Sequence, residues 1–519
     1  MRLLFRTFLV ALLLSSFIPS AFSTKLVELK IIDQDYIVLH FQDGDALYVD
    51  DGVGPGSLRE YNYDDPSNNF TVTYGNPLNI GNAIAAGNWI IKSSGDPNYS
   101  GNGQAVSSVS RKSKIGDTEE VEFVPGVGWT YEYSTEHFII LQLPNSMVSG
   151  QTYTLEINGS TESDTEIVSF DFDQLTTRSE AVHVNVVGYA NTNTIKAADL
   201  YMWLGNGGSR DYSSFVGNKV YLVDVATEVA TEVGNVSFGQ NNAVEYTGFD
   251  FTQSPVWHAD FTGFNTPGTY RLAIEGVGCS DEFEIRQDIY FQPYKVSTQG
   301  FYYMRIGEDV NANAANNVSK PRQPKLTAGD PSGFKVILTE LNPFDPQWAD
   351  QWDNPSAFVP FIKAGSPENT AVLKGHSDAR DWDRNLNHVT IIWDMLLPYI
   401  LTDGALSDDD LGIAESGNGD PDILDEARNE VDFWLALRDG PAYSWGLSNP
   451  TTIFANGIIY QAGTNSFAAW ANAVNCAIMA QAYRIHGDAA LETYYTNEAI
   501  TAYNFANTSA DPMLNNVWN

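Results

Sequence analysis

Cysteine is almost absent from this chain, since only Cys279 and Cys476 occur among its 519 residues. The two are far apart in sequence, so a disulfide framework is excluded and a metal site built from thiolates is not expected. Positive charge is also scarce, because 28 Lys and Arg residues stand against 65 Asp and Glu residues, for a formal net charge of −37. This excess of negative charge opposes binding to nucleic acid or to an anionic membrane surface.

A long apolar run occurs only at the start of the chain. Residues 1–23 have the pattern of a secretory signal, with Arg2 and Arg6 before the apolar stretch Phe8–Phe17 and a small-residue cleavage site at Ala21–Ser23. The apolar stretch is too short to span a bilayer, and no later stretch is long enough. We therefore expect a secreted protein, extracellular or periplasmic, that is monomeric and has no membrane partner.

Hydrophobic residues nevertheless make up 43% of the chain, enough for large buried cores. Between residues 24 and 178, Tyr36–Phe41, Phe138–Leu143 and the alternating Tyr153–Ile157 predict strands separated by polar turns. This pattern is typical of an antiparallel β-sandwich of the immunoglobulin or fibronectin kind. Four aromatic residues of this region fit either a sugar-binding platform or, more commonly, a core: Trp89, Trp129, Tyr131 and Tyr133.

Two further regions follow. In residues 179–287, the segments HVNVVGY (His183–Tyr189) and FTGFNTPGTYRLAIEG (Phe261–Gly276) carry strand alternation and a Pro-Gly turn. From residue 288 the pattern becomes helical, beginning with a segment that contains FYYMR and continuing with helices over Phe467–Ile485 and Leu491–Phe505.

A short acidic stretch, GHSDARDWDR at Gly375–Arg384, precedes an apolar helical segment. Asp378 and Asp381 are three positions apart, so both can face one cleft in a helical first turn or a tight loop. Hydrolysis of a sugar–sugar bond needs a carboxylate base or nucleophile and a separate carboxylic acid. Helix capping is the more frequent role of Asp beside a helix start, but three carboxylates in six positions exceed what capping needs.

A second stretch, ESGNGDPDILDEA, covers Glu415–Ala427. Asp420 suits a helix N-cap and Pro421 suits the first helical position. A buried stripe is predicted for the helix that follows: Ile423, Leu424, Ala427, Val431, Trp434 and Leu435. Taken alone, the carboxylates of this stretch are interpreted as caps and helix-surface groups.

The two stretches, in this order, resemble motifs of the family 9 glycoside hydrolases, which are inverting endoglucanases and cellulases. The first resembles the family's Asp-Ala-Gly-Asp motif, and the second its loop-helix signature ESGNGxPDxLDEA. The resemblance implies that Asp381 is the general base and that Asp378 helps to hold the attacking water. Trp382, Arg384 and His376 are then candidate substrate-binding residues; a metal site formed by His376 with Asp378 is the weaker alternative.

The resemblance extends beyond these motifs. Residues 179–287 resemble the immunoglobulin-like domain that precedes many family 9 catalytic domains. The implied fold is multidomain β plus α: two immunoglobulin-like β-sandwiches, then the N-terminal part of an (α/α)6 barrel in residues 288–519. Arg380 departs from the family's usual Gly, and Trp348 and Trp352 lie in a proline-rich loop that is a candidate lining of the cleft.

The implied substrate is a β-1,4-glucan such as cellulose. Family members often carry structural calcium, but the chain has no EF-hand pattern, so we assign no ligands and expect no required cofactor. The family's general acid is a Glu near the end of the catalytic domain, so we expect the residues up to Asn519 to be inactive alone. Two alternatives remain: an exo-acting β-glucosaminidase on the same fold, and a non-catalytic polysaccharide-binding protein.

Overall fold

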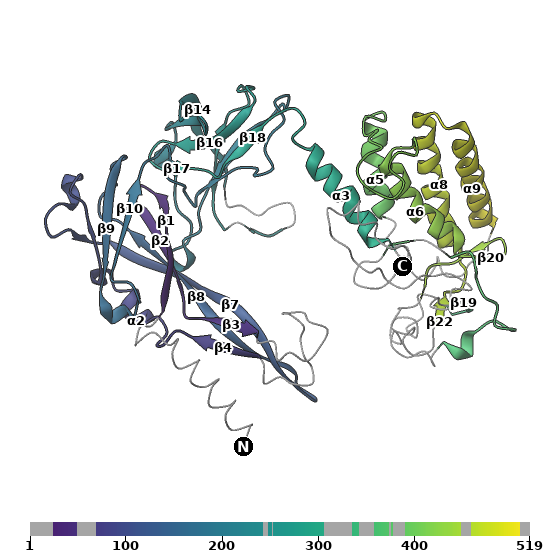
Figure 1. Cartoon of the computed structure of the whole chain (residues 1–519), viewed down its shortest axis with the longest axis horizontal. Coiled ribbons are helices and arrows are strands. Elements are labelled where there is room, and N and C mark those ends of the chain that lie inside the picture. Colours follow the sequence, from purple (N-terminus) through teal and green to yellow (C-terminus); the bar gives the residue numbers. More distant parts are fainter. Residues whose placement is uncertain are drawn as a thin grey trace, which may run out of the picture. The chain divides into compact units, whose positions relative to one another are not determined.

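The computed structural model describes residues 24–48, 69–241, 248–251, 253–305, 335–341, 358–372, 375–376, 390–447 and 458–508. The chain forms two compact units, one ending at Tyr290 and the other beginning at Phe291 (Figure 1). The first unit is built mainly from β-strands, and the second mainly from helices. The predicted signal segment 1–23 lies outside the described residues, and the predicted boundary between the two sandwiches stays a prediction.

The first part of the β unit contains two four-stranded antiparallel sheets, ordered β1-β2-β8-β7 and β10-β9-β5-β6. Their bounds are β1 Lys25–Asp33, β2 Tyr36–Gln42, β5 Trp89–Lys92, β6 Gln104–Ala105, β7 Ser108–Val124, β8 Gly128–Gln142, β9 Gln151–Ile157 and β10 Ile167–Phe172. A separate hairpin pairs β3 Gly44–Tyr48 with β4 Asn69–Thr73, and α2 is the single turn Ile80–Ala83. Strands predicted from alternation therefore occur where they were expected.

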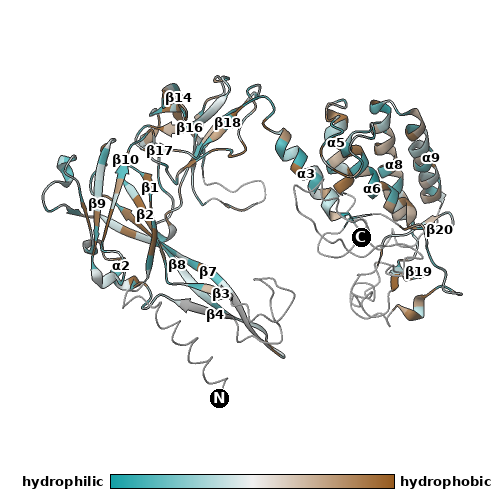
Figure 2. Ribbon diagram, viewed as in Figure 1, coloured by the Kyte–Doolittle hydropathy of each residue, from teal (hydrophilic) through white to brown (hydrophobic). Residues whose placement is uncertain are grey.

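Strands β1, β2 and β8 carry buried apolar side chains on both faces of the sheet β1-β2-β8-β7. Ile37 and Leu39 of β2 pack in a core that contains Trp89, whereas Val38 between them packs in a second core that contains Trp257. Because successive side chains of a strand point to opposite faces, both sides of this sheet are covered. The hydrophobic character of β1 and β2 is visible in Figure 2.

The four aromatic residues that fit either a sugar-binding platform or a core differ in their burial. Trp89 is fully buried, and its indole N–H donates a 2.8 Å hydrogen bond to the carbonyl of Ala83, so it is a core residue. Tyr131 and Tyr133 are about half exposed on β8, and Trp129 is partly buried.

The second core belongs to an eight-stranded sheet ordered β11-β12-β15-β14-β13-β16-β17, with β18 also paired to β16. The bounds are β11 Val182–His183, β12 Ala197–Leu200, β13 Lys219–Asp224, β14 Ala230–Gln240, β15 Val256–Asp260, β16 Gly268–Ile274, β17 Gly278–Cys279 and β18 Phe283–Ile285. Arg210 joins this sheet's region to the first one. Its Nε lies 2.8 Å from Oδ2 of the buried Asp33, and another of its nitrogens lies 2.8 Å from Asp35.

The helical unit contains α3 Phe291–Met304, α5 Thr390–Leu401, α6 Asp422–Ala436, α8 Ser466–His486 and α9 Ala489–Thr508. Two short pairs accompany them, the parallel β19 Lys335–Leu338 with β22 Ile458–Gln461, and the antiparallel β20 Arg438–Asp439 with β21 Ala442–Tyr443. Helices α5, α6, α8 and α9 share one apolar core, to which all six residues of the stripe predicted for α6 contribute. Among the described residues, no helix combines the length and the apolar character needed to cross a membrane.

One predicted helix boundary is wrong. Helix α6 begins at Asp422, so Pro421 rather than Asp420 precedes the first helical residue, and no side chain caps this end. The Asp420 carboxylate instead lies 3.1 Å from Nε2 of His486, at the end of α8. The predicted end of that helix is confirmed, because Gly487 closes α8 with a φ of +96°.

Candidate active site

Helix α6 carries two fully buried glutamates, Glu426 and Glu430, inside the helical unit. Glu426, Glu430 and Trp434 recur every four residues and therefore share one face of the helix. Both Glu side chains are fully buried, so the interpretation of Glu426 as a cap or helix-surface group is wrong. A buried carboxylate is costly unless charged and hydrogen-bonding partners replace the water that it loses.

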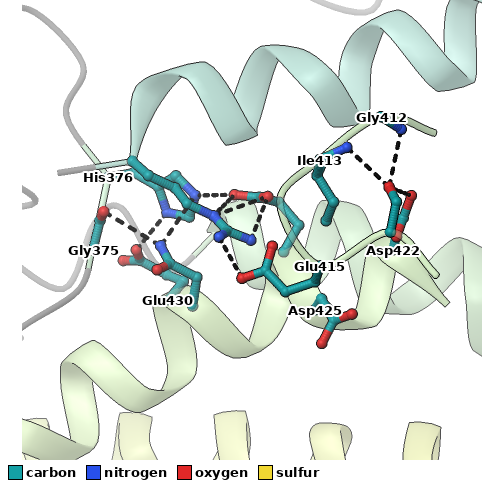
Figure 3. A network of polar contacts seen from close by, with 12 residues as sticks. Gly375, His376, Gly412, Ile413, Glu415, Asp422, Asp425 and Glu430 are labelled. Atoms are coloured by element: carbon teal, nitrogen blue, oxygen red, sulfur yellow. Dashed lines mark hydrogen bonds and ion pairs between the residues drawn. The ribbon is translucent and has the colours of Figure 1, made fainter. Parts of the chain in front are cut away.

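Arg305, the first residue after α3, provides one of these partners. Figure 3 shows the polar contacts of this region, with His376, Glu415 and Glu430 labelled. Its Nε lies 3.0 and 3.1 Å from the two carboxylate oxygens of Glu426, and a terminal nitrogen lies 2.9 Å from the second oxygen. Its other terminal nitrogen donates a 2.7 Å hydrogen bond to Glu415. Burial alone would lower the pKa of Arg305, but Glu426 and Glu415 raise it above its ordinary value.

His376 provides the second partner. Its Nε2 lies 2.7 Å from Glu426 Oε1, and its Nδ1 lies 2.7 Å from Glu430 Oε2. Burial alone would lower the pKa of His376, but the hydrogen bonds and charges of the two carboxylates raise it to about 10. The ring is therefore an imidazolium at neutral pH, and both of its nitrogens donate.

The same contacts affect the two carboxylates. Burial would raise the pKa of Glu426, but Arg305 and His376 hold it below its ordinary value. The other oxygen of Glu430, Oε1, accepts a 2.6 Å hydrogen bond from the indole N–H of Trp434. Two cations thus face the two fully buried glutamates, and one of the cations, Arg305, also pairs with Glu415.

Hydrogen bonds also fix the backbone at Gly375 and His376. His376 pairs with Arg305 in an isolated antiparallel bridge, and the Asn429 side chain donates a 3.3 Å hydrogen bond to the carbonyl of Gly375. Gly375 has a φ of +107°, and a Cβ added there would lie 2.9 Å from the ring of Phe433. This position therefore requires glycine for both conformation and space.

The ESGNGDPDILDEA loop folds onto the start of α6 through its own side chains. Asp422 accepts a 2.6 Å hydrogen bond from the backbone N–H of Leu411 and a 2.7 Å bond from the hydroxyl of Ser416. Asn418 donates a 2.9 Å hydrogen bond to Asp425. Burial, together with nearby acidic groups, raises the pKa of Asp425 to about 7. These bonds fix the loop that carries Glu415.

Sequence comparison relates this chain to known hydrolases. Endoglucanase D of Acetivibrio thermocellus is 27% identical over 232 residues, which are 43% of this chain and 32% of that protein. A xyloglucan-specific endo-β-1,4-glucanase of Bacteroides ovatus is 25% identical over 187 residues, 35% of this chain and 26% of that protein. The chain is a relative of the family 9 glycoside hydrolases. It spans about a third of the length of the curated relatives it matches.

No model of a protein family matches the chain. Among solved structures, a metagenome-derived family 9 endoglucanase is 22% identical with a TM-score of 0.47, covering 63% of this chain and 54% of that one. A family 9 glycoside hydrolase of Bacteroides ovatus is 18% identical with a TM-score of 0.46, covering 63% and 53%.

Of the site residues predicted from the family 9 motif, His376 is described. The others, Asp378, Asp381, Trp382 and Arg384, lie outside the described residues, as do Trp348 and Trp352. His376 is 1% exposed and directs both ring nitrogens at carboxylates. Among the described residues, no group of three or more His, Cys, Asp or Glu side chains is arranged to hold a metal ion.

Sequence reasoning did not predict the partners of His376, namely Arg305, Glu426 and Glu430. One signal was available, because Glu426, Glu430 and Trp434 share a spacing of four with the buried side of α6. Arg305 gave no such signal, since it is separated from Glu426 by 121 positions.

Proposed function

We propose that this protein is a secreted, inverting glycoside hydrolase of the family 9 type that cleaves β-1,4-glucan. The sequence relationship to endoglucanases supports the reaction class. The observation that carries the proposal is the joining of the two family motifs. Gly375 and His376, which begin the acidic motif, are bound to α6 of the second motif by three side chains.

In the proposed reaction, Asp381 accepts a proton from water as the water attacks the anomeric carbon, and Asp378 helps to hold that water. A carboxylic acid protonates the leaving oxygen. Inversion requires the two carboxyl groups to stand about 6.5–9.5 Å apart, with room for the water between sugar and base. Trp382 and Arg384 are proposed to contact the sugar, the first by stacking its ring.

The finer architecture is part of the same proposal. The β unit would comprise two immunoglobulin-like sandwiches, and the helical unit would be the N-terminal part of an (α/α)6 barrel. The segment at residues 1–23 would direct export. The mixed β and helical composition of the two units supports this arrangement.

The test is Asp381→Asn in a protein that carries the family's general acid, with turnover measured on a soluble β-1,4-glucan. General base catalysis is worth about 10²–10⁴-fold, so we expect a loss of that size with glucan binding retained. Asp383→Asn is the matched control, because it removes one charge from the same motif and should keep most of the turnover. Proton NMR of the first product should show the α-anomer, as inversion requires.

Three outcomes would contradict the proposal. Wild-type turnover by Asp381→Asn would mean that this carboxylate is not the base and that helix capping explains it better. Cleavage of chitosan oligomers in place of glucan would favour the exo-glucosaminidase. Glucan binding without turnover, in a protein that also carries the general acid, would favour the non-catalytic polysaccharide-binding protein.

A further inference from the structure

We infer that the buried cluster of Arg305, His376, Glu426 and Glu430 positions the acidic motif for the reaction. The cluster acts on the chemistry through the backbone at Gly375 and His376, and none of its members touches the substrate. This inference rests on the proposed function. It makes His376 a positioning residue in place of the substrate-binding residue predicted from the sequence.

Chain connectivity supplies the first step of the argument. Asp378 follows His376 by two positions in the sequence, and Asp381 follows it by five. Only Ser377 separates His376 from the proposed water-holding carboxylate, so we infer that a displacement of the His376 backbone also displaces Asp378. A shift of about 1 Å can reduce catalysis about 10²-fold.

The geometry of the cluster supplies the second step. His376 is hydrogen-bonded at both ends of its ring to residues one helical turn apart on α6, so the ring can neither rotate nor slide along the helix. Arg305 contacts both oxygens of Glu426, and its backbone pairs with that of His376. The start of the acidic motif is thus fixed by two cations and by main-chain pairing.

The choice of residue types supplies the third step. Apolar side chains of similar volume often stabilise a protein as well as a buried ion pair does, so stability alone does not explain this cluster. Charged hydrogen bonds differ from apolar contacts because they specify orientation. The cluster lies where orientation matters, two residues before the first aspartate of the motif.

The test variant is Glu430→Gln, which keeps the side-chain shape and removes one of the two charges that hold His376. In a protein that carries the general acid, we expect kcat on β-1,4-glucan to fall at least tenfold, with KM within about twofold of the value without the substitution. Amide hydrogen exchange should become at least tenfold faster in the peptide covering residues 375–389 and stay unchanged in α8. Trp434→Phe is a milder second variant, because it removes only the N–H donor to Glu430 and should move both readouts in the same direction.

A control and a rescue separate positioning from general stability. Arg210→Met breaks a comparable buried ion pair in the β unit, with Asp33, and should lower stability while leaving kcat of the folded protein unchanged. Arg305→Met should lower kcat, and Arg305→Lys should restore part of it, since Lys keeps the charge but lacks the planar fork of Arg.

Two results would overturn the inference. If Glu430→Gln raised KM with kcat unchanged, the cluster would act on substrate binding. If neither kcat nor exchange at residues 375–389 changed, its role would be structural only. Should a protein that carries the general acid fail to cleave β-glucan, the proposed function would fail, but the exchange measurement would still decide whether the cluster fixes this segment.

Discussion

Removing the positive charge of Arg305 should strongly destabilise the helical unit. The residue is 2% exposed, and its guanidinium lies 2.9–3.1 Å from the oxygens of the fully buried Glu426. In Arg305→Met, the Met side chain fills much of the same space, but Glu426 loses one of its two cations. Removing one partner of a buried pair costs about 3–5 kcal/mol. A domain is typically stable by only about 5–15 kcal/mol, so a large share of the stability would be lost.

Urea unfolding followed by far-ultraviolet circular dichroism measures this loss, because the long helices all belong to the helical unit. The matched control is Arg484→Met. Arg484 lies 2.7 Å from Glu492, but its side chain is 67% exposed, and such surface pairs are worth about 0–1 kcal/mol. Adding Glu426→Gln to Arg305→Met should recover part of the loss, because the uncompensated charge is then removed. A cost below about 1 kcal/mol for Arg305→Met would refute the argument that these charges depend on each other.

Two further predictions concern single positions beside the cluster. Burial raises the pKa of Asp425 from 3.8 to about 7, so the folded state favours the protonated carboxyl and loses stability as the pH rises across that interval. Asp425→Asn, whose amide oxygen can still accept the hydrogen bond from Asn418, should remove this loss. Its free energy of unfolding relative to wild type should therefore be greater at pH 8 than at pH 5, and a pH-independent difference would contradict the assignment. Gly375→Ala should lower stability by about 1–3 kcal/mol and the melting temperature with it, because of the positive φ and the overlap with Phe433. Gly300→Ala within α3 is its control, since a Cβ there meets open space, and equal melting temperatures of the two variants would show that the conformation at Gly375 is not strained.

Much of the fold was predictable because its elements repeat a local pattern. Strand β2 occupies Tyr36–Gln42, one residue longer than the predicted Tyr36–Phe41. Helix α8 extends the predicted Phe467–Ile485 by one residue at each end. In both cases the periodicity of apolar residues and the flanking polar or glycine residues suffice, because they act within one segment.

The candidate site was less predictable because its contacts join distant segments. Glu residues on a helix are usually exposed, so local reasoning interpreted Glu426 as a cap or helix-surface group and did not predict the burial of Glu430. Their burial depends on His376, 50 and 54 positions earlier, and on Arg305, 121 positions before Glu426. The acidic motif was recognised because its residue types are unusual for capping alone, but no local pattern shows which helix holds it.

The doubly covered sheet β1-β2-β8-β7 also bears on how this protein could be divided or recombined. Ile32, Val38 and Ile140 on one of its faces belong to the same core as residues of the eight-stranded sheet. A fragment ending near residue 178 would expose these side chains to water and would tend to aggregate. We therefore expect the two β regions to fold only together. A gene fusion joined between Tyr290 and Phe291 should leave the cores of both products intact.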